Sequence, residues 1–75
     1  MAEPPADWTP YLGRKVSIRF RLAGDPAHPF SEAIGVVSNV TDRPDGARSI
    51  SIVTRSGDTV EVAVADILAA KVFPL

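Results

Sequence analysis

Residues 15–22, KVSIRFRL, alternate strictly between polar and apolar side chains, and this run constrains the fold more than any other feature of the chain. Lysine, serine and two arginines occupy the odd positions, whereas valine, isoleucine, phenylalanine and leucine occupy the even ones. A period of two residues is typical of a β-strand with one buried and one solvated face. The sequence therefore predicts a sheet with a single apolar face.

Three more strands are predicted after a long surface loop at residues 23–32, which contains a glycine and two prolines. The strands span residues 33–41, 49–54 and 59–64, and the stretches between them, DRPDGA and RSGD, have the composition of turns. Gly35 lies early in the first of these strands. Glycine weakens a regular strand, so its presence there indicates a bulge or a sharp bend.

The last residues, VADILAAKVFPL, are compatible with two structures. At helical spacing, one face collects four apolar residues, Val64, Ile67, Leu68 and Val72. In the other structure, Asp66 caps a single helical turn over residues 67–70, and a closing strand follows. The first strand has an edge that needs cover, because exposed edges promote aggregation. We therefore predict the turn and the closing strand.

This order of elements predicts an all-β fold, a five-stranded Src-homology-3-like small barrel with one short helical turn before the last strand. The barrel should span residues 11–75, behind an extended or disordered arm at residues 1–10, where three prolines lack backbone donors. The alternation assigns seven residues to a common core: Ile18, Phe20, Val36, Ile52, Val62, Ile67 and Val72.

The composition narrows the classes of function. Eight basic and nine acidic residues give a net charge of -1, so the whole chain has no general attraction for nucleic acid or anionic lipid. The chain has no cysteine and therefore neither disulfides nor a thiolate zinc site. No apolar run is long enough to cross a membrane, and the acidic, proline-rich start is unlike a signal peptide. We expect a cytoplasmic protein without a membrane partner.

Three stretches of the chain are distinctive: LGRKVSIRFRL, EAIGVVSNV and RSGDTVEVAVADILAAKVFP. They resemble the small amino-terminal barrel that precedes the catalytic domain in a group of actinobacterial GNAT-family N-acetyltransferases. The resemblance covers residues 12–74, and its most particular parts are Gly13, Gly35 and the ending ILAAKVFP. In that family the downstream domain transfers the acetyl group, through a cofactor loop of the pattern Arg/Gln-x-x-Gly-x-Gly/Ala. Here RLAGDP has Pro26 at the last small position. The resemblance therefore implies an accessory barrel that binds no acetyl-CoA.

Catalytic and metal sites are not expected in this sequence. His28 is the single histidine, and Asp25 and Glu32 are the nearest acidic residues, too few to complete a metal site. Nucleophilic catalysis would need a serine organised around this histidine by a core too small to exclude water. We therefore predict a protein that is not an enzyme and that uses no cofactor.

The sequence offers one candidate binding face, made of three cations of the first strand and two aromatic residues: Lys15, Arg19, Arg21, Phe30 and Trp8. Small barrels that bind nucleic acid combine a cationic groove with exposed aromatic rings. The simpler interpretation is a solvated strand face whose charges discourage edge pairing and pair with acids such as Glu61.

We interpret the chain as a non-catalytic interaction module that packs against a partner protein or a fused domain, for which an acetyltransferase domain is the candidate. The alternative is a small barrel that binds nucleic acid through the basic face of its first strand. A groove for proline-rich peptides is disfavoured, because the chain has only five aromatic residues.

Overall fold

A computed structural model describes residues 3–22, 27 and 29–74 of the chain. Five antiparallel strands form one sheet in the order β4-β3-β2-β1-β5: β1 (Lys15–Arg21), β2 (Phe30–Asp42), β3 (Arg48–Thr54), β4 (Thr59–Ala63) and β5 (Ile67–Val72). Two short 3-10 turns, η1 (Thr9–Tyr11) and η2 (Val64–Asp66), precede β1 and β5. The predicted all-β small barrel, with one helical turn before its last strand, is confirmed.

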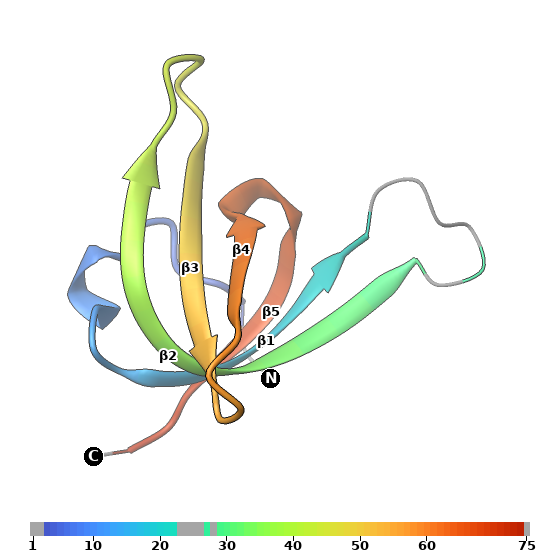
Figure 1. Ribbon diagram of the computed structural model, residues 1–75. Coiled ribbons are helices and arrows are strands. Elements are labelled where there is room, and N and C mark those ends of the chain that lie inside the picture. The colour runs from blue at the N-terminus through green and yellow to red at the C-terminus, as the bar shows by residue number, and fades with distance from the viewer. Residues whose placement is uncertain (1–2, 23–26, 28, 75) are drawn as a thin grey trace.

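The long strand β2 curves, and its two halves pair with different strands (Figure 1). Residues 30–36 pair with β1, and residues 35–42 pair with β3, so that only the middle of β2 has a neighbour on each side within the described chain. β2 begins at Phe30, three residues before the predicted start at residue 33. Residues 23–26 and 28 of the predicted loop lie outside the described residues.

Gly35 lies in the middle of β2, where β2 and β3 approach each other closely. A Cβ atom at this position would lie 2.7 Å from Cγ2 of Ile52 and still closer to the carbonyl oxygen of Val53. No residue other than glycine fits this space without a shift of the β3 backbone. A bulge in the β2–β3 pairing follows between Val37 and Asn39. Glycine is therefore needed for the close approach, and the bulge itself lies farther along the strand.

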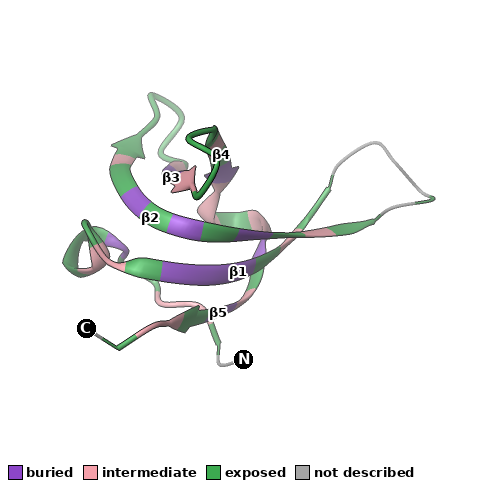
Figure 2. Cartoon of the chain, turned by 60° about the horizontal axis from the view of Figure 1, so that its bottom comes forward, coloured by how far each residue is buried: buried purple, intermediate pink, exposed green. Residues whose placement is uncertain are grey.

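The core lies on the concave side of the curved sheet. Figure 2 shows buried and exposed residues alternating along β2, whereas the middle of β1 is continuously buried. Ten apolar residues form the core: Trp8, Val16, Ile18, Ala33, Val37, Ile50, Ile52, Val62, Ile67 and Ala70. Of the predicted core residues, four are buried, Ile18, Ile52, Val62 and Ile67, and two pack at its border, Phe20 and Val72.

The placement of Val36 in the core is wrong. Its side chain is 41% exposed, because Ala33, Gly35 and Val37 take the inward positions of β2. The segment AIGVV is apolar at both even and odd positions, so alternation alone does not show which set faces inward. The close approach of Gly35 to β3 selects the odd positions.

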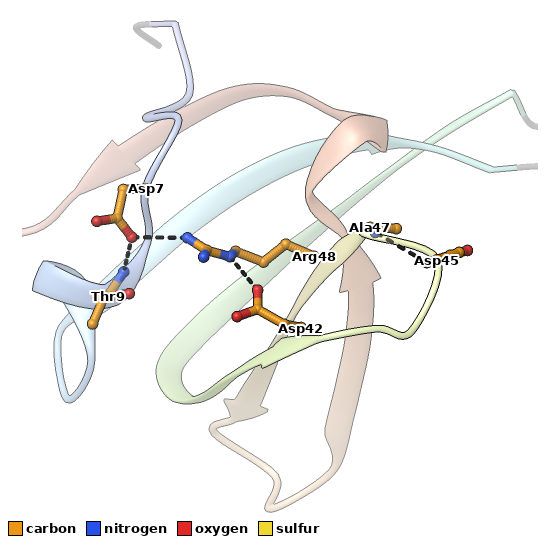
Figure 3. Close-up of polar contacts among 6 residues, drawn as sticks. All are labelled: Asp7, Thr9, Asp42, Asp45, Ala47 and Arg48. Carbon is orange, nitrogen blue, oxygen red and sulfur yellow. Dashed lines mark hydrogen bonds and ion pairs between the residues drawn. The ribbon is translucent and has the colours of Figure 1, made fainter.

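The predicted arm is attached to the barrel from Asp7 onward. Trp8 is fully buried in the core, and its ring meets that of Tyr11 edge to face at a centroid distance of 5.9 Å. One carboxylate oxygen of Asp7 accepts a hydrogen bond from the Thr9 amide at 3.0 Å and lies 3.1 Å from a terminal guanidinium nitrogen of Arg48 (Figure 3). The prediction of an extended or disordered arm is therefore wrong for residues 7–10.

The helical turn before the last strand lies three residues earlier than predicted. It spans Val64–Asp66, and residues 67–70, predicted as the turn, belong to β5. Asp66 is the last residue of the turn, which has no side-chain cap. β5 pairs antiparallel with β1. The closing strand is thus confirmed, and a terminal helix is excluded.

The inward register of β2 can be tested with two alanine substitutions. Val37→Ala should lower the free energy of unfolding by about 1.5–3 kcal/mol, because it truncates a fully buried side chain. Val36→Ala should change it by about 0.5 kcal/mol or less, because that side chain is exposed. Denaturant titration of both variants measures the difference. Similar losses in the two variants would contradict this register.

Acid should weaken the attachment of the arm. The pKa of Asp7 is lowered, chiefly by the hydrogen bond from the Thr9 amide, and further by the Thr9 side chain and the charge of Arg48. A lowered pKa means that the ionised carboxylate stabilises the fold above its unfolded pKa of about 4. This contribution is lost as the pH falls through the folded pKa.

We therefore expect Asp7→Asn to be less stable than the parent near neutral pH and the difference to shrink below about pH 4. Denaturant titrations of both proteins from pH 7 to pH 2.5 measure it. A difference that stays constant over this range would mean that the charge of Asp7 does not hold the arm.

Candidate functional site

The candidate site lies on the outer face of the sheet, opposite the core. The antiparallel register places the odd residues of β1 beside the even residues of β2 on this face: Lys15 opposite Val36, Ser17 opposite Ile34, Arg19 opposite Glu32 and Arg21 opposite Phe30. Strand alternation thus gathers basic side chains from one strand and apolar side chains from the other.

Three apolar side chains of β2 are exposed on this face. Phe30, Ile34 and Val36, which we call the β2 strip, are 54%, 50% and 41% exposed. Val53 of β3 lies directly beside Val36 in the register. Ile34 and Val36 follow one another on this face and adjoin Val53, whereas Glu32 lies between them and Phe30.

Cations surround the β2 strip, and most of them have no acidic partner. Among the described residues, Lys15, Arg21 and Arg55 make no ion pair, whereas Arg19 lies 3.5 Å from Glu32 with both side chains about half exposed. An exposed pair of this kind is worth at most about 1 kcal/mol and leaves both groups accessible. The outer face is therefore locally cationic, although the whole chain is not.

The predicted pairing of Glu61 with the cations of the first strand is wrong. Glu61 lies 3.5 Å from Arg43, which belongs to the β2–β3 turn. The ammonium of Lys15 instead lies 5.2 Å from the ring centroid of Phe73, and that of Lys71 lies 5.3 Å from it. Cation–π contacts of this kind leave the positive charge without a counter-ion.

A groove of about 660 Å³ opens where β3 turns away from β2. It is lined by residues 34–36 of β2, residues 53–55 at the end of β3, and Lys15. Aliphatic side chains and the backbone around Gly35 form its apolar part, and Lys15 and Arg55 supply positive charge. The groove can therefore hold an apolar group next to an anionic one.

Four of the five residues predicted for the binding face share the outer face: Lys15, Arg19, Arg21 and Phe30. The fifth, Trp8, was placed there wrongly, because it is fully buried in the core. The sequence interpretation also missed Ile34, Val36 and Arg55. The apolar run AIGVV was a signal that half of its residues face outward, but no sequence signal places Arg55 beside them.

The described residues contain no group of three or more histidine, cysteine or acidic residues able to hold a metal ion. Of the residues considered for such a site, His28 and Asp25 lie outside the described residues, and Glu32 forms an ion pair with Arg19. Of the serines, Ser17 and Ser49 are buried, and Ser56 contacts Thr54 and Asp58. Within the same part of the chain, no helix has the length and apolar character needed to span a membrane.

The bent five-stranded sheet and its strand order define a small β-barrel domain of the Sm and Src-homology-3 type. The chain matches the family model described as the Rv0428c N-terminal Sm-like domain over residues 10–71, and it belongs to this family. No curated protein and no solved structure matches the chain.

Proposed function

We propose that this domain is a cytoplasmic, non-catalytic interaction module that packs against a partner protein or a fused domain through its outer face. The exposed β2 strip is the observation that carries the proposal. Protein interfaces combine an apolar centre with a polar, charged rim. The outer face has this arrangement, with the β2 strip at its centre and Lys15, Arg21 and Arg55 around it.

A GNAT-type acetyltransferase domain is the proposed partner. The chain resembles the barrel that precedes such domains over residues 12–74. The family is described as an N-terminal domain. This description supports the proposal that a second domain follows the barrel in related proteins. An accessory barrel of this kind would present the β2 strip to the partner and keep its core on the opposite side of the sheet.

Titration of the chain with the acetyltransferase domain encoded downstream or in the neighbouring reading frame tests this proposal. Isothermal calorimetry should detect binding, and Val36→Glu should weaken it at least tenfold, because a charge would enter the apolar centre. Leu12→Glu is the matched control, since Leu12 is also an exposed apolar residue but does not line the groove. The control should bind within about twofold of the parent. Equal weakening by both substitutions, or a genome with no such domain nearby, would reject the acetyltransferase partner.

A nucleic-acid interface is the second candidate, and the register gives it one specific observation. Arg21 lies directly opposite Phe30, so a guanidinium and an exposed ring are neighbours on the same face as Lys15 and Arg19. Cations beside an exposed aromatic ring form the kind of surface on which single-stranded bases stack. However, the other two residues of the β2 strip are aliphatic and offer no further ring.

The salt dependence of oligonucleotide binding separates the two candidates. If Lys15, Arg19 and Arg21 each contact a phosphate, the slope of log affinity against log salt concentration should be about -2.7. We expect instead feeble binding that Arg19→Glu and Arg21→Glu do not change, because the chain has a net charge of -1 and Phe30 is the one aromatic residue of the β2 strip. Fluorescence polarisation with single-stranded and duplex probes at two salt concentrations measures this. Micromolar, salt-sensitive binding that the double variant abolishes would favour nucleic acid.

A further inference from the structure

The first half of β2 has a strand on one side only within the described chain. Residues 30–34 pair with β1, and pairing with β3 begins at Gly35. Figure 1 shows this half of β2 and the end of β1 extending away from β3 and β4, and β5 pairs with β1 on the side opposite β2. Within the described chain, residues 30–34 of β2 therefore have an open edge on the side away from β1.

The backbone groups on this edge point away from β1. The Val37 amide donates to the Arg14 carbonyl at 3.0 Å, and the Pro29 carbonyl accepts from the Leu22 amide at 2.8 Å, so the odd residues of β2 face β1. Backbone groups of successive residues in an antiparallel strand point to opposite sides. Phe30 and Glu32 therefore direct their amides and carbonyls outward, where no described residue forms a backbone hydrogen bond with them.

The groove and the cations indicate what this edge would bind. The groove begins where β3 leaves β2, in line with the open edge, and Ile34, Val36 and Val53 give it apolar walls. Arg55 lies at this end, and Arg21 lies at the other end opposite Phe30. Neither arginine has an ion pair with a described residue. A matching segment would place aliphatic side chains in the middle and carboxylates at both ends.

We propose that the open edge of β2 binds an extended segment of a partner protein by β-strand addition. The backbone of the segment would pair with Phe30 and Glu32, and its aliphatic side chains would lie beside Ile34. Its terminal acidic residues would pair with Arg55 and, across Phe30, with Arg21 on β1. This inference rests on the proposed function and specifies how the partner is held.

A synthetic heptapeptide of the sequence Asp-Thr-Val-Thr-Val-Thr-Asp tests the proposal. In an extended strand its aspartates and valines share one face and its threonines the other. Titration of the chain, followed by amide chemical shifts, should give saturable changes clustered at residues 30–34 and 53–55. A peptide with lysine in place of both aspartates should bind at least tenfold more weakly. Shifts that are absent or scattered over the sheet would overturn the proposal.

N-methylated forms of the same peptide test strand pairing without altering the protein. Methyl groups on the amides of the odd residues block one edge of the peptide, and methyl groups on those of the even residues block the other. One of these two forms should lose binding at least tenfold, and the other should remain within about threefold of the parent. Loss in both forms or in neither would contradict strand addition.

Charge variants of the protein test the ends of the site. Arg55→Glu should weaken peptide binding at least tenfold, whereas Arg43→Glu, the same substitution in the distant β2–β3 turn, should leave it within about threefold. Equal effects of the two variants would overturn the role of Arg55. Dimerisation of the free chain through this edge, measured by analytical ultracentrifugation, would mean that a second copy is the occupant.

The outcomes separate this inference from the proposed function. If the peptide fails to bind but Val36→Glu still weakens binding of the acetyltransferase domain, strand addition is wrong and the outer face remains an interface. If Val36→Glu has no effect on that domain, the proposed function is wrong whatever the peptide does.

Discussion

The close approach of β2 and β3 at Gly35 is the contact on which the rest of this structure depends. A side chain at this position would collide with Ile52 and with the backbone of Val53. The approach fixes which residues of β2 face the core, and one step in register would exchange the two faces of the strand. Gly35 is also the first residue of β2 that pairs with β3. The groove and the open edge of β2 both begin at this point.

The fold could be predicted because its information is local. The alternation of residues 15–22 gives both the strand and its inward face, since every odd position there is polar. The segment around Gly35 lacks this information, because all of its neighbours are apolar and only contact with β3 decides their direction. The predicted position of the turn before β5 was wrong for a similar reason. Capping by Asp66 is a favourable local arrangement, but burial of Ile67 in the core requires the strand to begin there.

Trp8 shows how the size of a domain changes the meaning of a local signal. Prolines near the amino terminus predict an extended or mobile arm, in which only Trp8 and Tyr11 at its far end are candidates to anchor it to the barrel. A domain of 75 residues, however, buries only about 60% of the surface that its unfolded chain exposes, less than a larger domain does, and gains much from one large aromatic side chain. Trp8 is the largest of the fully buried side chains. The need to complete the core therefore outweighs the local preference of the arm.

The candidate site could be predicted only where a single strand supplies it. Lys15, Arg19 and Arg21 follow from the alternation of one strand, and Phe30 joins them because the register places it opposite Arg21. Arg55 comes to the site through the pairing of β2 with β3, which no local pattern specifies. Its place beside the groove therefore became known only from the structure.

The distribution of charge on the folded chain bears on the kind of partner proposed for the β2 strip. Three described acidic residues pair with arginines outside β1: Glu61 with Arg43, and Asp7 and Asp42 with Arg48. Lys15, Arg21 and Arg55 make no ion pair with a described residue, although the net charge of the chain is -1. Two such faces brought together would repel each other, because like charges would meet across the apolar strips. An acidic partner would instead gain ion pairs at the rim while it covers the strip, so the same cations that oppose self-association favour an acidic partner.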